Sequence, residues 1–226
     1  SECATGKPFA HYWMHNGFIN IDNEKMSKSA GNFFTVRDIL KEYEAEDVRM
    51  FMLSAQYRSP INFSREMIAQ AHASLQRLYT ARDNMAFLLR HAPERDMTAE
   101  EQALLGRVQE AVARFDGAMD DDLNTADAMG ALFDIVKDAN VTLNAQSSRA
   151  AVRGTLDTLQ ALADVLGLLE KEYSEKLPED IQAMVSQRAQ ARKEKDWKKS
   201  DELRDAIKAA GYLIEDTPQG QKVAKL

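Results

Sequence analysis

The sequence predicts a mainly α-helical protein with a short mixed head and a small mixed tail. Four segments between residues 64 and 166 place apolar residues at alternating steps of three and four, the spacing of one helix face. Each apolar face needs a partner, so the four segments should form a helical bundle. Near the C-terminus, two alternating runs separated by a turn predict a β-hairpin.

The head is expected to contain one strand and two short helices. Residues 11–21 are rich in aromatic and β-branched side chains and predict a strand, and residues 22–32 form a polar loop after it. Thr35 is a helix cap, with Asp38 favourably placed in the first turn of a helix that should reach about residue 44. A second helix is predicted over about residues 46–55.

The four bundle helices each have a start signal. Ser64 begins the first, which ends before Pro93; Thr98 and Glu101 make a capping box for the second. Asn124 or Thr125 caps the third, and Ser147 opens the fourth. Arg82 alone interrupts the first apolar stripe. The stripes are Ile68, Ala71, Leu75, Leu78, Met85 and Leu89; Leu105, Val108, Val112, Phe115 and Met119; Met129, Leu132, Phe133, Val136 and Leu143; and Val152, Leu156, Leu159, Ala163 and Leu166.

The tail predicts a small α+β unit. A charged linker follows residue 171, and helices are expected over about residues 178–195 and 197–210. Gly211 should end the second helix. Residues 212–216 and 221–226 should then pair as a hairpin across the turn at 217–220.

Composition excludes several classes of protein. Hydrophobic residues make up 44% and charged residues 29% of the 226 residues, which rules out a disordered chain, and no apolar run is long enough to cross a bilayer. A single cysteine, Cys3, indicates a reducing compartment, with the cytoplasm as the default. The net charge of -7 argues against a generally basic nucleic-acid binder. The start at Ser1, without a signal peptide, suggests a fragment of a longer protein.

The most informative stretch is the loop Lys25-Met26-Ser27-Lys28-Ser29, followed by Ala30-Gly31-Asn32. Two ammonium groups and two hydroxyls on a short loop with a glycine can contact phosphate oxygens and can move. Small basic loops are common, however, and composition alone favours a solvated surface loop that binds nothing.

The same stretch resembles the complete second signature of the class I aminoacyl-tRNA synthetases. Within that class, the surrounding sequence resembles cysteinyl-tRNA synthetase rather than the methionine, leucine or valine enzymes, and the resemblance covers essentially the whole chain. The segments that carry it are residues 11–17, 32–38, 57–59, 119–125, 195–197 and 215–220.

The resemblance implies a C-terminal portion of such an enzyme. Residues 1–34 would be a remnant of a Rossmann-type catalytic domain with the ATP loop, and residues 35–63 the junction helices that contact the tRNA stem. Residues 64–172 would be a tRNA-binding, DALR-like bundle, and residues 173–226 a small α+β anticodon-binding domain. The intact enzyme would be a monomeric cysteine-tRNA ligase, and this chain alone is expected to be inactive.

In that family the loop closes over ATP, which enters with Mg²⁺ as a substrate. The resemblance assigns contact with the triphosphate to Lys28, with Lys25, Met26, Ser27 and Ser29 completing the ATP site. A cation on the leaving phosphates stabilises the transition state more than the ground state, because negative charge grows there.

Two features of the family are absent from this sequence. The first class signature, His-x-Gly-His, does not occur, and the zinc ligands that select cysteine should precede Ser1. His11 and His15 share a face only on a helix, whereas their segment predicts a strand. No metal ligand is therefore assigned in this chain.

The tail carries a second candidate site. Residues 188–199 contain six basic and two acidic side chains, a local charge of +4, around Trp197. Basic groups that follow phosphates, with an aromatic ring that stacks on an unpaired base, are typical of single-stranded RNA recognition. A tryptophan in the core of the small domain and a solvated lysine face would look the same in sequence. The resemblance assigns anticodon binding to Arg192, Trp197, Asp201 and Asp216, whose groups suit the base edges of a GCA anticodon.

Two further features have alternative interpretations. Asp120-Asp121-Asp122 is interpreted as negative charge favouring the helix start at Asn124 or Thr125 rather than as a metal site. Residues 56–60 are assigned to the junction that meets the inner side of the tRNA.

Two other functions remain open at this point. One is a stand-alone tRNA-binding module without catalysis. The other is a ligase that joins cysteine to an amino sugar, which resembles the catalytic half of the synthetase. The segment from residue 188 to residue 220 argues against the second, because that reaction needs no anticodon domain.

Overall fold

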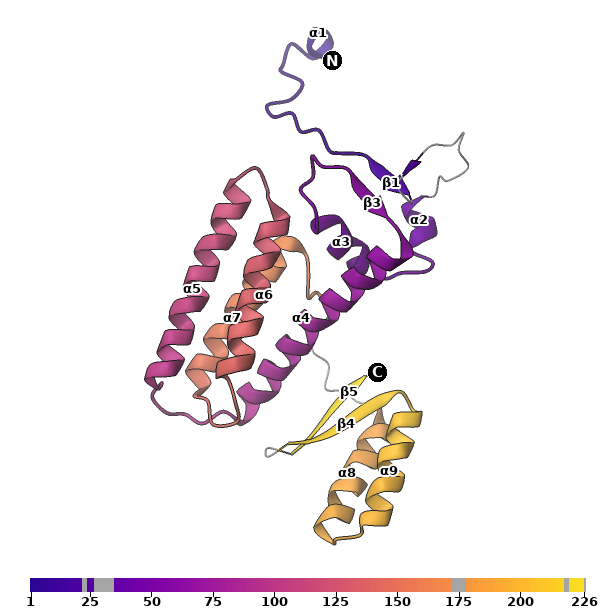
Figure 1. Ribbon diagram of the computed structural model, residues 1–226, viewed down its shortest axis with the longest axis vertical. Coiled ribbons are helices and arrows are strands. Elements are labelled where there is room, and N and C mark those ends of the chain that lie inside the picture. The colour runs from indigo at the N-terminus through magenta and orange to yellow at the C-terminus, as the bar shows by residue number, and fades with distance from the viewer. Residues whose placement is uncertain (22–23, 27–34, 172–177, 218–219, 226) are drawn as a thin grey trace.

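The computed structural model describes residues 1–21, 24–26, 35–171, 178–217 and 220–225. Figure 1 shows an extended head, a helical bundle and a small C-terminal domain. The described part is mainly helical, as predicted, and none of its helices is long and apolar enough to cross a membrane.

The head contains α1 (Glu2–Thr5) and a three-stranded sheet of order β2-β1-β3. β1 (Ile19–Ile21) pairs parallel with β3 (Ile61–Phe63) and antiparallel with β2 (Glu24–Lys25). The predicted strand over residues 11–21 is therefore wrong in length. A strand needs a paired neighbour, and β3 offers only three residues, so residues 11–18 lie outside the sheet despite their strand-like composition.

Gly17 allows the head to approach the junction closely. Its N–H donates to the carbonyl of Tyr57 at 2.7 Å, and the N–H of Ile61 donates to the carbonyl of Phe18 at 3.0 Å. A Cβ at Gly17 would lie 2.2 Å from the carbonyl oxygen of Ser59, well inside van der Waals contact. This close approach fixes where β1 begins.

Two helices of the junction follow. α2 (Val36–Ile39) starts at Thr35 with the predicted capping interaction, since the Thr35 hydroxyl accepts from the Asp38 N–H and the Asp38 carboxylate accepts from the Thr35 N–H. The helix is shorter than expected and gives way to turns, because Glu44 is extended where it caps α3 (Ala45–Leu53).

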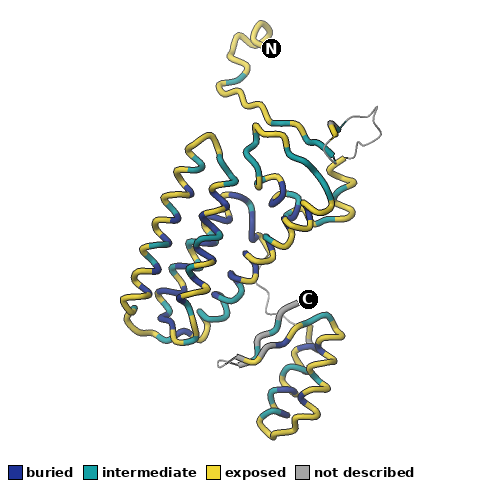
Figure 2. The backbone as a smooth tube through the Cα atoms, in the orientation of Figure 1, coloured by how far each residue is buried: buried dark blue, intermediate teal, exposed yellow. Residues whose placement is uncertain are grey.

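The bundle consists of α4 (Arg65–His91), α5 (Ala99–Asp120), α6 (Thr125–Thr142) and α7 (Arg149–Leu166). Ser64, Thr98 and Asn124 cap the first three as predicted. The fourth begins one residue later than expected, because Ser148 accepts from Ala151 N–H at 3.3 Å. Buried residues recur along each of these helices (Figure 2).

The buried face of α5 is wider than the predicted stripe and includes residues outside it. Leu104 and Ala111 are buried, whereas Leu105 and Val112 are only half-buried. The reason is that α5 packs against both α6 and α7, so its buried face is wider than a single stripe.

Arg82, which interrupts the stripe of α4, helps to hold the end of the bundle. It is buried and donates to the carbonyls of Leu169 and Lys171. Glu46 on α3 accepts from the N–H of Leu169 and from the hydroxyl of Tyr79, each at 2.5 Å. These contacts, here called the exit cluster, fasten the segment after α7 to α3 and α4.

The C-terminal domain contains α8 (Glu179–Lys193), α9 (Trp197–Ala209), β4 (Tyr212–Thr217) and β5 (Gly220–Lys225). The hairpin is confirmed, with β4 and β5 antiparallel. Gly211, with φ of +86°, ends α9 in a conformation that favours glycine. The small core consists of Ile181, Ala191, Ile207 and Ile214.

Glu101 joins the starts of α5 and α7. Its carboxylate is 4% exposed and accepts from the N–H groups of Thr98 and Ser148, each at 2.9 Å. Arg95 adds two hydrogen bonds at 3.0 and 2.7 Å. Burial alone would raise the pKa of Glu101, but these hydrogen bonds outweigh it and lower the pKa to about 2.

Replacing this carboxylate should destabilise the bundle. Glu101→Gln should lower the free energy of unfolding at pH 7 by about 3 kcal/mol, because Arg95 loses its buried partner. In the wild type, this stabilisation is complete above pH 4.5, the ordinary glutamate pKa, and is lost as the pH falls through about 2. Urea unfolding from pH 7 to pH 2 measures both effects.

The neighbouring Glu100 is exposed and supplies the control. Glu100→Gln should cost only a few tenths of a kcal/mol, about the value of a charge at a helix N-terminus. An equal loss in both variants, or an unchanged pH dependence in Glu101→Gln, would contradict this role.

The close approach at Gly17 is also testable. Gly17→Ala should speed hydrogen exchange at the Ile61 amide by about tenfold or more, because an added Cβ separates the two segments that this amide joins. Gly106→Ala, on α5 with open space around it, should leave that exchange unchanged. Equal exchange at the Ile61 amide in both variants would show that the hydrogen bond of this amide does not depend on the close approach at Gly17.

Candidate functional site

The predicted ATP loop begins at the end of β2. Lys25 is the last residue of that strand, and Met26 is half-buried directly after it. Ser27, Lys28 and Ser29, with Gly31 and Asn32, lie outside the described residues. The chain is described again from Thr35, where the capped start of α2 follows.

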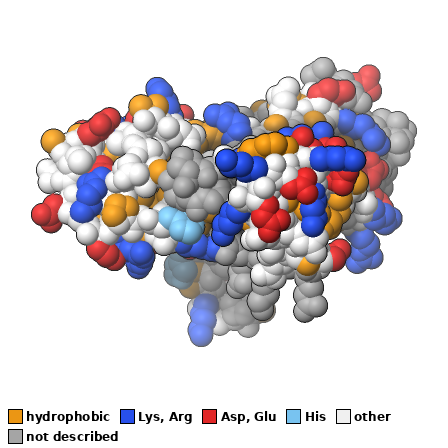
Figure 3. Space-filling view, turned by 90° about the horizontal axis from the view of Figure 1, so that it is seen from below, with side chains coloured by type: hydrophobic (Ala, Val, Ile, Leu, Met, Phe, Trp, Pro, Cys, Tyr) orange, Lys and Arg blue, Asp and Glu red, His pale blue; other side chains and the backbone are white. Residues whose placement is uncertain are grey.

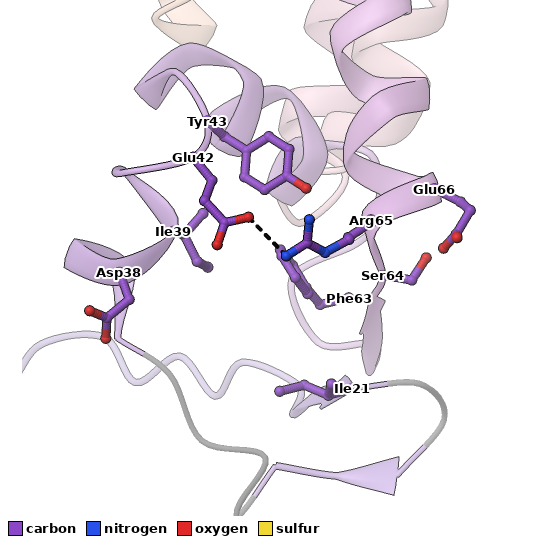
Figure 4. Close-up of a pocket in the computed structure, with 9 residues that line it drawn as sticks. All are labelled: Ile21, Asp38, Ile39, Glu42, Tyr43, Phe63, Ser64, Arg65 and Glu66. Carbon is purple, nitrogen blue, oxygen red and sulfur yellow. Dashed lines mark ion pairs between the residues drawn. The ribbon is translucent and has the colours of Figure 1, made fainter.

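A pocket of about 400 Å³ lies beside β1 and α2 (Figure 4). Its lining brings together three carboxylates and one guanidinium, and Arg65 pairs with Glu42 at 3.0 Å. A hydrogen bond from Lys41, with others from Thr35, holds the pKa of Asp38 well below its usual range. The excess of negative charge makes this pocket unsuitable for a triphosphate. The lining residues are Ile21, Asp38, Ile39, Glu42, Tyr43, Phe63, Ser64, Arg65 and Glu66.

The C-terminal domain brings two arginines of α8 onto one carboxylate of β4. Arg188 donates to Asp216 through both arms of its fork, with Nη1–Oδ1 at 2.8 Å and Nη2–Oδ2 at 2.9 Å. Arg192, one turn further along α8, pairs with Oδ2 at 2.9 Å. The hydrogen bonds from Arg188, with the charge of both arginines, lower the pKa of Asp216. Its carboxylate therefore stays ionised at neutral pH. These three residues are here called the arginine clamp.

Trp197 lies next to the clamp and is open to solvent. Trp197 is the first residue of α9 and is 57% exposed. The guanidinium carbon of Arg192 lies 5.8 Å from the centroid of its ring. The alternative that Trp197 fills the core of this domain is therefore wrong. An exposed indole beside a guanidinium can accept a stacked base.

Asp201 lies one turn after Trp197, on the same face of α9. Its carboxylate pairs with Arg204 at 3.2 Å, and both side chains are exposed. Of the four predicted anticodon residues, the structure joins Arg192 with Asp216 by an ion pair and Arg192 with Trp197 by proximity. Among the described residues, no hydrogen bond or ion pair joins Asp201 to those three.

The basic stretch is less strongly charged at the surface than the sequence suggests. Arg188 is 2% exposed, and its charge is paired with Asp216 within the domain rather than presented at the surface. Lys193, Lys195, Lys198 and Lys199 are exposed. In the view of Figure 3, Lys and Arg side chains are interspersed with Asp and Glu and do not form one uniform basic field.

Sequence reasoning missed the particular role of Arg188. The signal was its position: Ile181, Arg188 and Ala191 follow helical spacing, and all three are buried. An arginine at a buried position of a helix predicts hydrogen-bond acceptors from another part of the chain, as Arg82 on α4 also illustrates with the carbonyls of Leu169 and Lys171.

The acidic triplet before α6 also has a role that sequence reasoning missed. Asn124, not an aspartate, caps the helix, and Asp122 pairs with Arg58 at 2.6 Å. The hydroxyl of Tyr57 donates to the same carboxylate at 2.8 Å. Asp122 thus connects the junction segment to the bundle, and charge at a helix end does not account for it.

The described residues contain no group of three His, Cys, Asp or Glu side chains that could hold a metal ion. His11 and His15 are exposed in an irregular segment, and Cys3 is also exposed. The described part of the chain therefore does not fit the zinc site of the family.

Three family models match successive parts of the chain. The catalytic domain of class I tRNA synthetases, cysteine type, matches residues 1–73. The DALR domain matches residues 114–170, and the anticodon-binding domain of cysteinyl-tRNA ligases matches residues 174–223. The last match covers α8 and β4, which carry the three residues of the arginine clamp.

Curated relatives agree with these matches. A cysteine–tRNA ligase of Caldicellulosiruptor saccharolyticus is 46% identical over all of this chain and 48% of its own length. One of Symbiobacterium thermophilum is 48% identical over 97% of this chain and 47% of its own length. The chain thus spans about half the length of the relatives it matches.

A solved structure supports the fold. The LeuRS of Agrobacterium radiobacter K84, in a ternary complex with tRNA and LeuAMS, superimposes with a TM-score of 0.56 over 66% of this chain and 20% of its own. At 20% identity this likeness concerns the fold alone.

Proposed function

Because this chain belongs to the cysteinyl-tRNA synthetase family, we propose that it supplies the ATP loop and the tRNA-binding parts of a cysteine-tRNA ligase. The intact enzyme would activate cysteine with ATP and transfer it to the 3' end of cysteine tRNA. We propose that residues 1–34 are a remnant of the catalytic domain with the ATP loop and that residues 35–63 are the junction helices. Residues 64–172 would be the tRNA-binding bundle, and residues 173–226 the anticodon-binding domain. The observation that carries the RNA-binding role is the exposed Trp197 beside the arginine clamp.

The chemistry of this surface suits an unpaired anticodon. Trp197 offers a face on which a base can stack, and Arg192 offers N–H donors to a guanine edge. Asp216 and Asp201 accept from amino groups of bases. Arg192 is 40% exposed, so its guanidinium can reach RNA while it remains beside Asp216.

Removing the indole should weaken tRNA binding. Trp197→Ala should lower the affinity of the chain for cysteine tRNA by about tenfold or more, the effect of losing one stacked base. Filter binding at fixed salt measures it. Trp13→Ala removes the other tryptophan, which is 68% exposed in the head, and should leave the affinity unchanged. Unchanged affinity in Trp197→Ala would discard the stacking role.

The ATP-binding role rests on the loop after β2. In the intact enzyme, ATP would enter with Mg²⁺ as substrate, and Lys28 would contact the phosphates that leave as pyrophosphate. Lys25, Met26, Ser27 and Ser29 would complete the loop. The acidic pocket beside α2 supports phosphate binding by the lysines of the loop, because the negative charge of the pocket disfavours phosphates there.

Lys28→Ala in the full-length enzyme should slow adenylate formation by about 100-fold or more, because a cation on the developing charge is lost. Affinity for cysteine tRNA should change little. Pyrophosphate exchange and filter binding measure the two effects. Lys208→Ala is the control, because Lys208 is exposed and lies in the last turn of α9. Comparable losses of exchange and tRNA affinity in Lys28→Ala would contradict the assignment.

The two other functions are less well supported. The match of residues 174–223 to an anticodon-binding domain disfavours a ligase that acts on an amino sugar. The match of residues 1–73 to a catalytic domain disfavours a binding module that lacks catalysis. We further propose a monomeric, cytoplasmic enzyme whose zinc ligands lie outside this chain.

A further inference from the structure

Arg188 has no access to RNA, yet it makes the strongest contacts of the arginine clamp. Its side chain is 2% exposed, and both arms of its fork are bound to Asp216. A two-armed ion pair fixes the plane of a carboxylate, whereas a single contact allows it to rotate. Arg188 therefore determines which way the Asp216 oxygens point.

A neighbour across the hairpin holds Arg188 in turn. Gln221 on β5 faces Asp216 in the strand register. In the amide orientation that satisfies its surroundings, its oxygen accepts from Arg188 Nη1 at 2.6 Å and its nitrogen donates to the carbonyl of Val185 at 3.0 Å. The guanidinium is thus braced between α8 and β5.

Stability alone does not explain a buried arginine at this position. Its Nε atom is buried without a partner among the described residues, which carries a desolvation cost. Apolar residues of similar volume often replace a buried ion pair without loss of stability. The geometry instead provides a fixed direction for the carboxylate of Asp216.

That direction leaves room for one more hydrogen bond. An ionised carboxylate has about four acceptor positions. Arg188 occupies one on each oxygen, and Arg192 pairs with Oδ2. With Gln221 in that orientation, the position left without a hydrogen-bond partner among the described residues lies on Oδ1, and the side chain of Asp216 is 38% exposed. This position can accept one hydrogen bond from an amino group of a base.

We propose that Arg188 is a positioning residue for anticodon discrimination: it aims Oδ1 of Asp216 at the exocyclic amino group of an unpaired base. This inference rests on the proposed RNA-binding function. It assigns Arg188 no contact with RNA. It predicts that loss of the two-armed contact affects the choice between anticodons more than general tRNA affinity.

The test compares two transcripts by filter binding to the whole chain. One is cysteine tRNA; in the other the anticodon cytosine is replaced by uracil, which has an oxygen in place of the amino group. Arg188→Lys keeps the charge but cannot make two parallel contacts. It should reduce the preference for cytosine by about tenfold while changing the affinity for the uracil transcript by less than about twofold.

Controls separate positioning from folding. Arg82→Lys alters another buried arginine, in the bundle, and should keep the preference intact. Gln221→Ala removes the brace without touching the ion pair and should reduce the preference by a smaller factor, which keeps the test decisive if Arg188→Lys unfolds. In an Asp216→Asn background, Arg188→Lys should lower the preference no further, because both changes act through one group.

The outcomes distinguish this inference from the proposed function. If the unaltered chain binds both transcripts equally, anticodon recognition itself is wrong. If it prefers cytosine and Arg188→Lys keeps that preference, or weakens both transcripts by one common factor, only the positioning role is wrong. Additive losses in the double variant would also overturn it.

Discussion

The end of the C-terminal domain that carries Arg192 and Trp197 depends on the ion pair between Arg188 and Asp216. Burying a guanidinium is costly, and the cost is offset only when the carboxylate meets both arms of the fork. The two lengths of 2.8 and 2.9 Å satisfy that condition and tie α8 to β4. The positions of Arg192 and of the exposed Trp197 follow, because both lie on or next to the same end of α8.

The exit cluster plays a comparable part where the chain leaves the bundle. Glu46, Tyr79 and Arg82 supply hydrogen bonds to the backbone of residues 169–171, which belong to no helix. Loops near a core need partners for their polar backbone groups, and side chains of α3 and α4 provide them. The junction, the bundle and the start of the linker are therefore held by one set of polar contacts.

Local signals predicted the helices well. The caps at Ser64, Thr98 and Asn124 depend on residues within three positions, so sequence contains the whole interaction. The length of β1 depends on a partner 42 residues away, and the pairing of Asp122 with Arg58 spans 64 residues. Composition cannot reveal such partners. The same limit applies to Arg188, whose sequence neighbours suggested a surface charge although its partner lies on β4.

Anticodon recognition by the C-terminal domain is the central claim, and filter binding across a salt series tests it most directly. The chain would be titrated with cysteine tRNA and with a transcript whose whole anticodon is replaced. The preference for cysteine tRNA should persist as salt rises, because base contacts are less sensitive to salt than phosphate contacts. Equal affinities for the two transcripts at every salt concentration, with the same steep fall in affinity as salt rises, would indicate phosphate contacts alone. That result would contradict anticodon recognition.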